Sequence, residues 1–438
     1  MTDNSALRRE VLRLAVPAFL ALVAEPLFLM ADSAIIGHLG TQQLAGLGAA
    51  SAALLTAVGV FVFLAYATTA TSARRLGAGD RAGAIASGID GLWLSVIIGV
   101  GAAVLMGVFA GPLVGLFGAS EATTTYAVEY LQIACFGIPP MLASLAVTGV
   151  LRGLQDTKTP LIASVAAFSL NVVLNVALVY GLHLGIAGSA IGTVIAQWGM
   201  AIALVWVLIS QARREQAPLR FHPTGVLTSA RSGFPLFVRT VALRITLLLT
   251  TWVAARMGDV PLAAYQVSMT IWNFLAFVLD ALAIAAQALT GKALGEGQRD
   301  EVRSLTGLLQ TWGVLFGALL AVLLLATHTV LPLAFTSDAT VRAALAAALI
   351  VIAIGQPLAG YVFVLDGVLI GAGDGRWLGI AQVAMLIAYL PVVWALHTYA
   401  PSDPRAATVW LWVGFTVFMA VRGLLLGLRA RTDAWMKI

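Results

Sequence analysis

Charged residues are scarce in this sequence, and their scarcity decides the class of protein. Only 10% of the 438 residues are Asp, Glu, Lys or Arg, whereas about 25% are charged in ordinary soluble domains. Apolar residues make up 60% of the chain. Such a chain cannot cover a soluble surface, so the composition predicts an all-α polytopic membrane protein.

Cysteine and enzyme motifs are lacking as well. The single cysteine, Cys135, lies in an apolar stretch, which excludes a disulfide within the chain and favours a packing role. The sequence contains no His-Glu-x-x-His, no Gly-x-x-x-x-Gly-Lys and no Gly-x-Ser-x-Gly. The five histidines fall in predicted loops or span ends. We therefore expect no enzyme activity, no metal site and no bound cofactor.

Long apolar runs are what the sequence does have. A helix crosses a bilayer with roughly 20 apolar residues. By this measure we predict twelve spans, at residues 11–36, 43–73, 83–109, 123–149, 159–181, 186–210, 226–256, 262–291, 302–326, 340–369, 377–397 and 406–428.

The positive charges predict the orientation of these spans. Segments on the side of the N-terminus hold nineteen Lys and Arg residues, and segments on the other side hold only Arg256, Arg342 and Arg405. Because Lys and Arg accumulate in cytoplasmic loops, we expect both termini in the cytoplasm, with the chain in a plasma membrane such as a bacterial inner membrane. The positive residues behind the net charge of +5 then orient the chain in the membrane and contact lipid head groups. We expect no nucleic-acid partner.

The chain repeats itself at a constant offset of 218 residues. Arg13 and Pro17 recur as Arg231 and Pro235, and the pattern Gly149-Val-Leu-x-Gly-x-x-Asp156 recurs at Gly367–Asp374. A gapless offset over several loops predicts two six-helix lobes. Since six is an even number, we expect the lobes to be related by a pseudo-two-fold axis along the membrane normal. The predicted division is an N-terminal lobe at 1–210, a cytoplasmic linker at 211–232 and a C-terminal lobe at 233–438.

Two acids in the first span are the leading candidates for function. Glu25 and Asp32 are seven residues apart, which places them on one helical face roughly 10 Å apart. Pro26, beside Glu25, removes a backbone donor and favours a kink. Acids at membrane depth face a bundle interior or a wet cavity and commonly exchange protons. The pair therefore suggests a proton-driven membrane device.

Polar residues on the fifth and sixth spans are candidates to partner these acids. Asn171 and Asn175 share one helical face, and Thr193 follows on the next span. Their amide and hydroxyl groups suit a protonated carboxylate or a hard cation. The alternative is that they only tie helices together.

The second half lacks these acids, since Leu243 and Thr250 stand at the matching positions. We expect an arginine of the seventh span to form a structural ion pair with Asp280. Asp366, near a span end, is expected to reach water or a cavity. Aromatic and polar residues of several spans are candidates to line a large cavity, although such residues also serve as packing or interface anchors: Tyr66, Trp198, Gln266, Trp272, Asn273, Gln287, Gln356 and Tyr361.

Several of these patterns resemble the multidrug and toxic compound extrusion (MATE) family, in its DinF-like branch. The resemblance rests on Glu25-Pro-Leu, Asp32-Ser-Ala, Gly37-His-Leu-Gly40, the paired Gly-Val-Leu-x-Gly-x-x-Asp segments and Asn171-x-x-x-Asn175, and it extends over essentially the whole chain. It implies a twelve-helix, V-shaped exporter of two lobes that exchanges cytoplasmic, often cationic and aromatic, compounds for inward-moving protons or sodium ions.

The resemblance also assigns roles to single residues. Asp32 matches the coupling aspartate of the family's first helix, and Asn171 and Thr193 match polar partners in the same lobe. The sequence departs at Asn175, where several relatives have a second aspartate. With one carboxylate fewer to neutralise Na⁺, proton coupling is preferred.

Sequence reasoning thus predicts a proton-coupled antiporter, acting as a monomer on amphipathic or cationic compounds. A sodium-coupled exporter of the same family and a lipid-linked precursor flippase remain alternatives. A flippase would have a more cationic cavity and often extra helices. A passive channel or scaffold would need neither buried acids nor two lobes.

Overall fold

The computed structural model describes residues 4–116 and 120–436. The described residues form helices and connecting turns, with no strand among them. The first half holds α1 (Asn4–Gly37), α2 (Thr41–Val60), α3 (Phe63–Gly77), α4 (Arg81–Val108), α5 (Ala110–Gly115), α6 (Glu121–Ala134), η1 (Cys135–Gly137), α7 (Ile138–Gly153), α8 (Lys158–Val176), the π-helical η2 (Ala177–Gly181) and α9 (Gly185–Arg214). The second holds α10 (Pro223–Met257), α11 (Asp259–Gly295), α12 (Arg299–Thr327), η3 (Leu331–Ala334), α13 (Ala339–Gly371), α14 (Gly375–Tyr399) and α15 (Pro404–Ala430).

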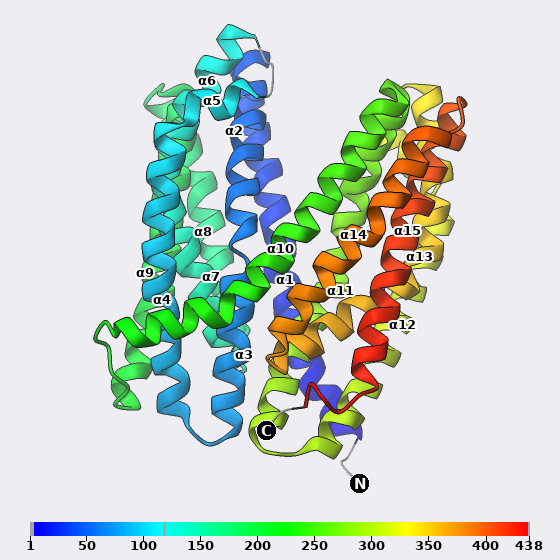
Figure 1. Cartoon of the computed structure of the whole chain (residues 1–438). Coiled ribbons are helices and arrows are strands. Elements are labelled where there is room, and N and C mark those ends of the chain that lie inside the picture. Colours follow the sequence, from blue (N-terminus) through cyan, green and yellow to red (C-terminus); the bar gives the residue numbers. More distant parts are fainter. Residues whose placement is uncertain (1–3, 117–119, 437–438) are drawn as a thin grey trace. The chain divides into compact units, whose positions relative to one another are not determined.

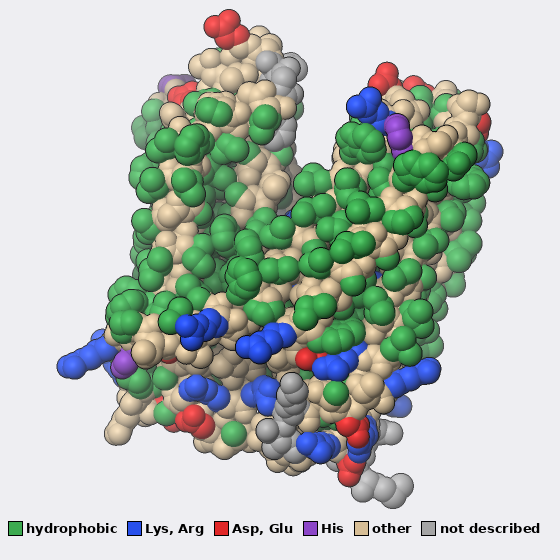
Figure 2. All heavy atoms as spheres, viewed as in Figure 1, with side chains coloured by type: hydrophobic (Ala, Val, Ile, Leu, Met, Phe, Trp, Pro, Cys, Tyr) green, Lys and Arg blue, Asp and Glu red, His purple; other side chains and the backbone are tan. Residues whose placement is uncertain are grey.

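Twelve helical segments are long and apolar enough to cross a membrane, which confirms the predicted spans. α2 and α3 together make one span, and so do α6, η1 and α7. Apolar side chains cover the visible face along the helices of each unit, and most Lys and Arg lie toward one end of them (Figure 2).

The helices group into two compact units, each of which packs its helices side by side (Figure 1). Unit 2 comprises Val16–Phe234, and unit 1 comprises Pro235–Ile438 together with the chain up to Ala15. Each unit therefore includes a helical segment that the sequence alone would assign to the other half. Within the predicted linker, residues 211–214 belong to α9 and residues 223–232 to α10, so only 215–222 lie between helices.

The repeat in the sequence is also present in the backbone. Gly79 and Gly297 have φ angles of 76° and 75°, and each ends a helix whose last turn is closed by the same pair of backbone hydrogen bonds. The positive φ is the usual C-terminal stop of a helix. Gln155 and Gly373, also 218 residues apart, have φ angles of 64° and 73°. The matching turns show that the two halves share one local design.

Close helix contacts repeat at the same offset. A Cβ on Gly149 would lie 2.4 Å from the carbonyl oxygen of Ala65, and one on Gly367 would lie 2.4 Å from that of Ala283. Helices can approach this closely only where a glycine leaves the backbone bare. In unit 2 this brings α7 against α3, and α4, α7 and α9 then enclose an apolar core.

Candidate functional site

Asp32 is buried inside unit 2 and is held by uncharged donors. Its side chain is only 3% exposed. Asn175 of α8 donates from Nδ2 to Asp32 Oδ1 at 2.5 Å, and the Ser189 hydroxyl of α9 donates to the same oxygen at 2.8 Å. Among the described residues no Lys or Arg pairs with this carboxylate. The charge of ionised Asp32 is therefore stabilised by hydrogen bonds alone.

A chain of amide groups extends from Asp32 along α8 to α9. Asn175 Nδ2 also donates to Asn171 Oδ1 at 3.0 Å, and Asn171 Nδ2 donates to Thr193 Oγ1 at 3.0 Å. The structure thus brings together Asp32, Asn171, Asn175 and Thr193, as the sequence predicted. Their part in ion coupling stays a prediction.

The acceptor of Asn175 is left over in this arrangement. Both amide hydrogens of Asn175 are committed, while its Oδ1 is buried with no hydrogen-bond partner in the part of the chain that the structure describes. An unsatisfied buried acceptor is costly, so one beside a titratable acid calls for an explanation.

Local backbone features bring α8 and α9 close enough to build this network. A Cβ on Gly192 would lie 2.3 Å from Asn175 Oδ1, and one on Gly188 would lie 2.9 Å from the backbone of Leu178. Asn175 is followed almost at once by the single π-helical turn η2, a feature frequent at functional sites. The small residues after Leu184 therefore let α9 approach the polar face of α8.

Sequence analysis missed two members of the site. Ser189 lies four residues before Thr193, so the spacing of the two hydroxyls on one face of α9 could have identified it. Tyr130 of α6 is buried, and its hydroxyl interacts with Ser189, Thr193 and Ser51. No local pattern predicts Tyr130, because only the packing of α6 against α9 brings it to the site.

The other first-span candidates are less well defined. Glu25 lies within α1, but its side chain is outside the part that the structure describes. Pro26 is half-buried inside α1. Farther along the helix, Tyr180 donates its hydroxyl hydrogen to the carbonyl oxygen of Ile35 at 2.5 Å. This contact ties the end of α1 to η2.

The eight cavity candidates are divided between the units. Tyr66 and Trp198 belong to unit 2, where the indole of half-exposed Trp198 donates to the carbonyl of Phe136 at 3.2 Å. The other six belong to unit 1.

Within unit 1 these six lie in different settings. Trp272 packs edge-on against Phe415, with ring centroids 5.3 Å apart. Gln287 and Gln356 are buried, while Gln266 and Asn273 are exposed. Tyr361 is half-buried, and its hydroxyl reaches α15, since a Cβ on Gly427 would lie 2.5 Å from that oxygen. Gln287 and Gln356 are therefore inaccessible to a ligand without a rearrangement.

Unit 1 has an uncharged counterpart of the Asp32 site. Thr250, the repeat partner of Asp32, lies 3.1 Å from the hydroxyl of Tyr389, the repeat partner of Asn171. The residue matching Asp32 thus contacts the helix that matches α8 in unit 1 as well, although in unit 2 the contact of Asp32 is with Asn175, one turn after Asn171. Only unit 2 has an acid there.

The structure corrects the expectation for Asp366. Its side chain is buried and is bound by Arg239 and by Arg422, whose Nη2 lies 3.1 Å from Asp366 Oδ2. The expected reach to water or to a cavity is therefore wrong, because two buried guanidinium groups hold the carboxylate inside unit 1. Arg239 contributes to this with its Nε, which donates to Asp366 Oδ1 at 3.3 Å. The expected ion pair of Asp280 with an arginine of the seventh span stays a prediction.

Comparisons with known proteins agree with this fold. The MatE family model matches twice, at residues 17–177 and 235–394, in step with the repeat. The chain is 31% identical to Protein DETOXIFICATION 44, chloroplastic, of Arabidopsis thaliana, over 97% of this chain and 83% of the relative. It is 29% identical to DNA damage-inducible protein F of Escherichia coli, over 94% and 89%. A solved structure of the MATE transporter VcmN of Vibrio cholerae has a TM-score of 0.89 at 22% identity, covering 100% of both chains.

Proposed function

Because the chain belongs to the MatE family of membrane transporters, we propose that it exports amphipathic, often cationic compounds in exchange for protons. The family and the twelve spans make it an integral membrane transporter, not an enzyme. The coupling ion and the substrate class are the parts that we propose. The observation that supports them is the buried Asp32, whose only partners among the described side chains are uncharged.

Protonation of Asp32 changes the hydrogen-bond balance of the whole site. The ionised carboxylate accepts two hydrogen bonds at Oδ1, whereas the protonated acid is also a donor and needs an acceptor. The unsatisfied Asn175 Oδ1 is such an acceptor. Turning this amide would redirect the donor that now reaches Asn171 and would alter the contact of α1 with α8.

α1 is suited to respond to this change. Of the twelve spans it is the least covered by other parts of the protein, since only 18% of its most apolar stretch of 18 residues is buried. Pro26 has no N–H, so the carbonyl of Leu22 lacks its intrahelical donor and the helix bends there at lower cost. In our mechanism the proton enters from outside, α1 repacks against Asn171 and Asn175, and substrate is expelled. Inward opening then lets a new cation compete with the proton.

A sodium-coupled cycle is the second candidate, because the oxygen atoms of the Asp32 network are of the kind that binds Na⁺. Asp32 Oδ1, Asn171 Oδ1 and Thr193 Oγ1 are oxygen ligands within one network, and Asn175 Oδ1 has no partner in the described chain. Hard cations are bound by such oxygens. The site has only one carboxylate, and a second negative charge would favour Na⁺ binding more strongly. We therefore prefer the proton as the coupling ion.

Purified protein in liposomes tests the proposal directly. With ethidium as the substrate cation, an imposed pH gradient should drive its uptake in a proton-coupled protein, whereas a sodium gradient alone should not. Asp32→Asn should abolish the exchange. Asp403→Asn, a change at the exposed N-cap of α15, should leave it at the wild-type rate. Transport by Asp32→Asn at the wild-type rate would refute the proposal, and sodium-driven transport would favour the second candidate.

We further propose a monomer in a plasma membrane, with both termini in the cytoplasm. The excess of nineteen Lys and Arg residues over three supports this orientation. Because Cys135 is buried, a cysteine introduced at Thr432 would be the only reactive thiol. It should react with an impermeant maleimide in inverted vesicles and not in intact cells. Labelling in intact cells would reverse the assigned orientation.

A further inference from the structure

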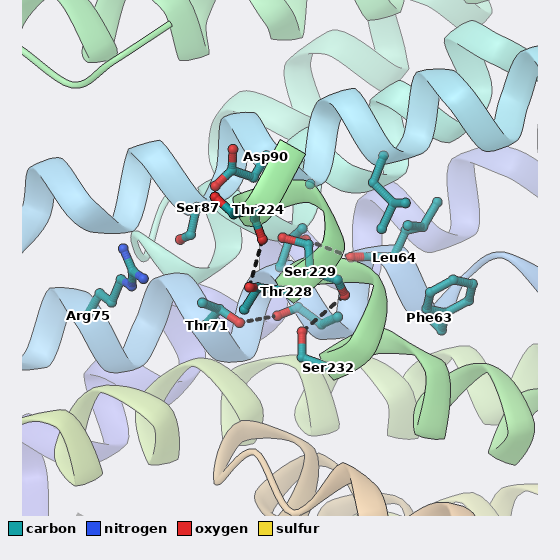
Figure 3. A pocket seen from close by; sticks show the side chains of 15 residues that line it. Phe63, Leu64, Thr71, Arg75, Ser87, Asp90, Thr224, Thr228, Ser229 and Ser232 are labelled. Carbon is teal, nitrogen blue, oxygen red and sulfur yellow. Dashed lines mark hydrogen bonds between the residues drawn. The ribbon is translucent and has the colours of Figure 1, made fainter. Parts of the chain in front are cut away.

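A polar cavity lies in unit 2, apart from the Asp32 network. It has a volume of about 250 Å³ and is enclosed by α3, α4 and the first turns of α10 (Figure 3). None of the residues of the Asp32 network lines it. The cavity therefore needs its own explanation.

Asp90 supplies the negative charge of this cavity. It projects from α4 and is half-buried. Among the described residues, none donates a hydrogen bond to its carboxylate or forms an ion pair with it. A Cβ on Gly225 would lie 2.2 Å from Asp90 Oδ2. The bare backbone of α10 thus makes room for the carboxylate at the cavity wall.

The hydroxyl groups of the wall add acceptors. Thr71 and Ser87 each donate their hydrogen to a carbonyl of their own helix at 2.9 Å, and Thr228 and Ser232 do so at 2.8 and 3.0 Å. A hydroxyl that donates its hydrogen to a carbonyl can still accept hydrogen bonds through its oxygen lone pairs. Four such oxygens and one carboxylate favour a ligand that is cationic and rich in donors.

Two basic groups lie near Asp90, but neither forms an ion pair with it in the part of the chain that the structure describes. Arg75 Nη1 donates to the carbonyl of Gly83 at 2.8 Å, and Gly83 lies seven residues before Asp90, about 10 Å along the helix. Arg75 also lines the cavity, and Figure 3 shows it at the end opposite Phe63. His222, the other basic neighbour, is exposed, with Nδ1 2.9 Å from the Arg220 carbonyl oxygen.

The opposite end of the cavity is apolar. Phe63, Leu64 and Leu94 line it there, and Figure 3 shows Phe63 and Leu64 on the side away from Arg75. The cavity thus offers a carboxylate and hydroxyl acceptors beside an apolar wall, which suits a small amphipathic amine.

We infer that this cavity binds a primary ammonium group, with Asp90 as its counter-ion and the hydroxyls of α3, α4 and α10 as acceptors. The apolar part of the ligand lies against Phe63 and Leu64. Two sources carry this chemistry, a free amine from the aqueous phase and the ethanolamine head group of a lipid. The inference goes beyond the proposed function, since binding here does not require coupled transport.

Isothermal titration calorimetry of the full-length protein in nanodiscs of phosphatidylcholine and phosphatidylglycerol tests it. Benzylammonium should bind, and Asp90→Asn should weaken this binding about 10- to 100-fold, because a hydrogen-bonded charge is lost. Ser87→Ala should weaken it by about 10-fold or less. Benzyltrimethylammonium has the same charge but no N–H donor, and it should bind the wild type more weakly.

Two further measurements distinguish this site from the Asp32 network and identify the source of the ammonium group. Asp32→Asn should bind benzylammonium with wild-type affinity. In nanodiscs with phosphatidylethanolamine, an unchanged affinity would identify free amines as the ligand and a competitive loss would identify the head group. Either result supports an ammonium site. Equal binding of benzylammonium by the wild type and Asp90→Asn, or equal binding of neutral benzyl alcohol, would overturn it.

Discussion

Replacing Asn175 with alanine is the sharpest test of how the acid of unit 2 is controlled. The substitution removes the donor that lies 2.5 Å from Asp32 Oδ1 and leaves the Ser189 donor in place. A hydrogen bond to a carboxylate favours its ionised form. Asn175→Ala also removes the acceptor proposed for the protonated acid, but a hydrogen bond to the ionised carboxylate is the stronger of the two. The net loss should therefore let the site hold its proton to higher pH.

The size of the effect follows from the strength of this bond. A hydrogen bond to a charged group contributes about 1.5–3 kcal/mol, and a change of 1.36 kcal/mol moves a titration by about one pH unit. The midpoint of the pH profile of transport should accordingly move upward by about one to two pH units. Part of the bond energy is recovered if water enters the space left by the amide, which would place the shift at the lower end of that range.

The assay is the initial rate of ethidium-driven proton exchange in liposomes, with internal and external pH raised together so that the gradient stays constant. Asn171→Ala is the matched control, because Asn171 contacts Asn175 and Thr193 but not Asp32. Its midpoint should move less. If Asn175→Ala transports with an unmoved midpoint, or with one displaced to lower pH, the assignment of Asp32 as the titrating group is wrong.

Three further predictions concern stability. Gly149→Ala and Gly367→Ala should each destabilise the protein by about 1–3 kcal/mol, because the added methyl overpacks equivalent helix contacts. Thermal unfolding in detergent measures this, and Gly101→Ala, which has open space around it, is the control that should not be destabilised. Equal melting temperatures for all three variants would contradict the packing argument. Two backbone amides at the start of α13 donate to Asp338 and lower the pKa of this carboxylate below its usual 3.8. The contribution of Asp338 to folding stability should therefore be complete above pH 3.8 and should be lost as the pH falls through the lowered pKa. The gap in melting temperature between wild type and Asp338→Ala should therefore close in acid, and a constant gap would refute this. Asp366→Ala should cost about 3–5 kcal/mol, because it removes the carboxylate that two buried guanidinium groups share. A stability within about 1 kcal/mol of wild type would show that the other contacts of these guanidinium groups compensate for its loss.

The sequence predicts the fold well because apolar length and repeat spacing are local properties. Twelve spans follow from hydropathy alone, and the turns at Gly79 and Gly297 follow from the repeat. The Asp32 site was predictable in part, since Asn171 and Asn175 share a helical face. Tyr130 and the burial of Asp366 were not predictable, because each depends on which helix packs against which, and periodicity along one helix does not contain that information.

The grouping of the chain ends has a consequence for how such a protein could have arisen. Residues up to Ala15 group with the second half of the chain, and Pro223–Phe234 group with the first. If a gene for six helices was duplicated, each ancestral copy would have lent its leading arm to the other, as in a domain-swapped homodimer. Fusion of the two genes would then have kept an exchange that already existed. A cut near residue 210 would leave each fragment with the arm that groups with the other fragment and without the arm that groups with itself.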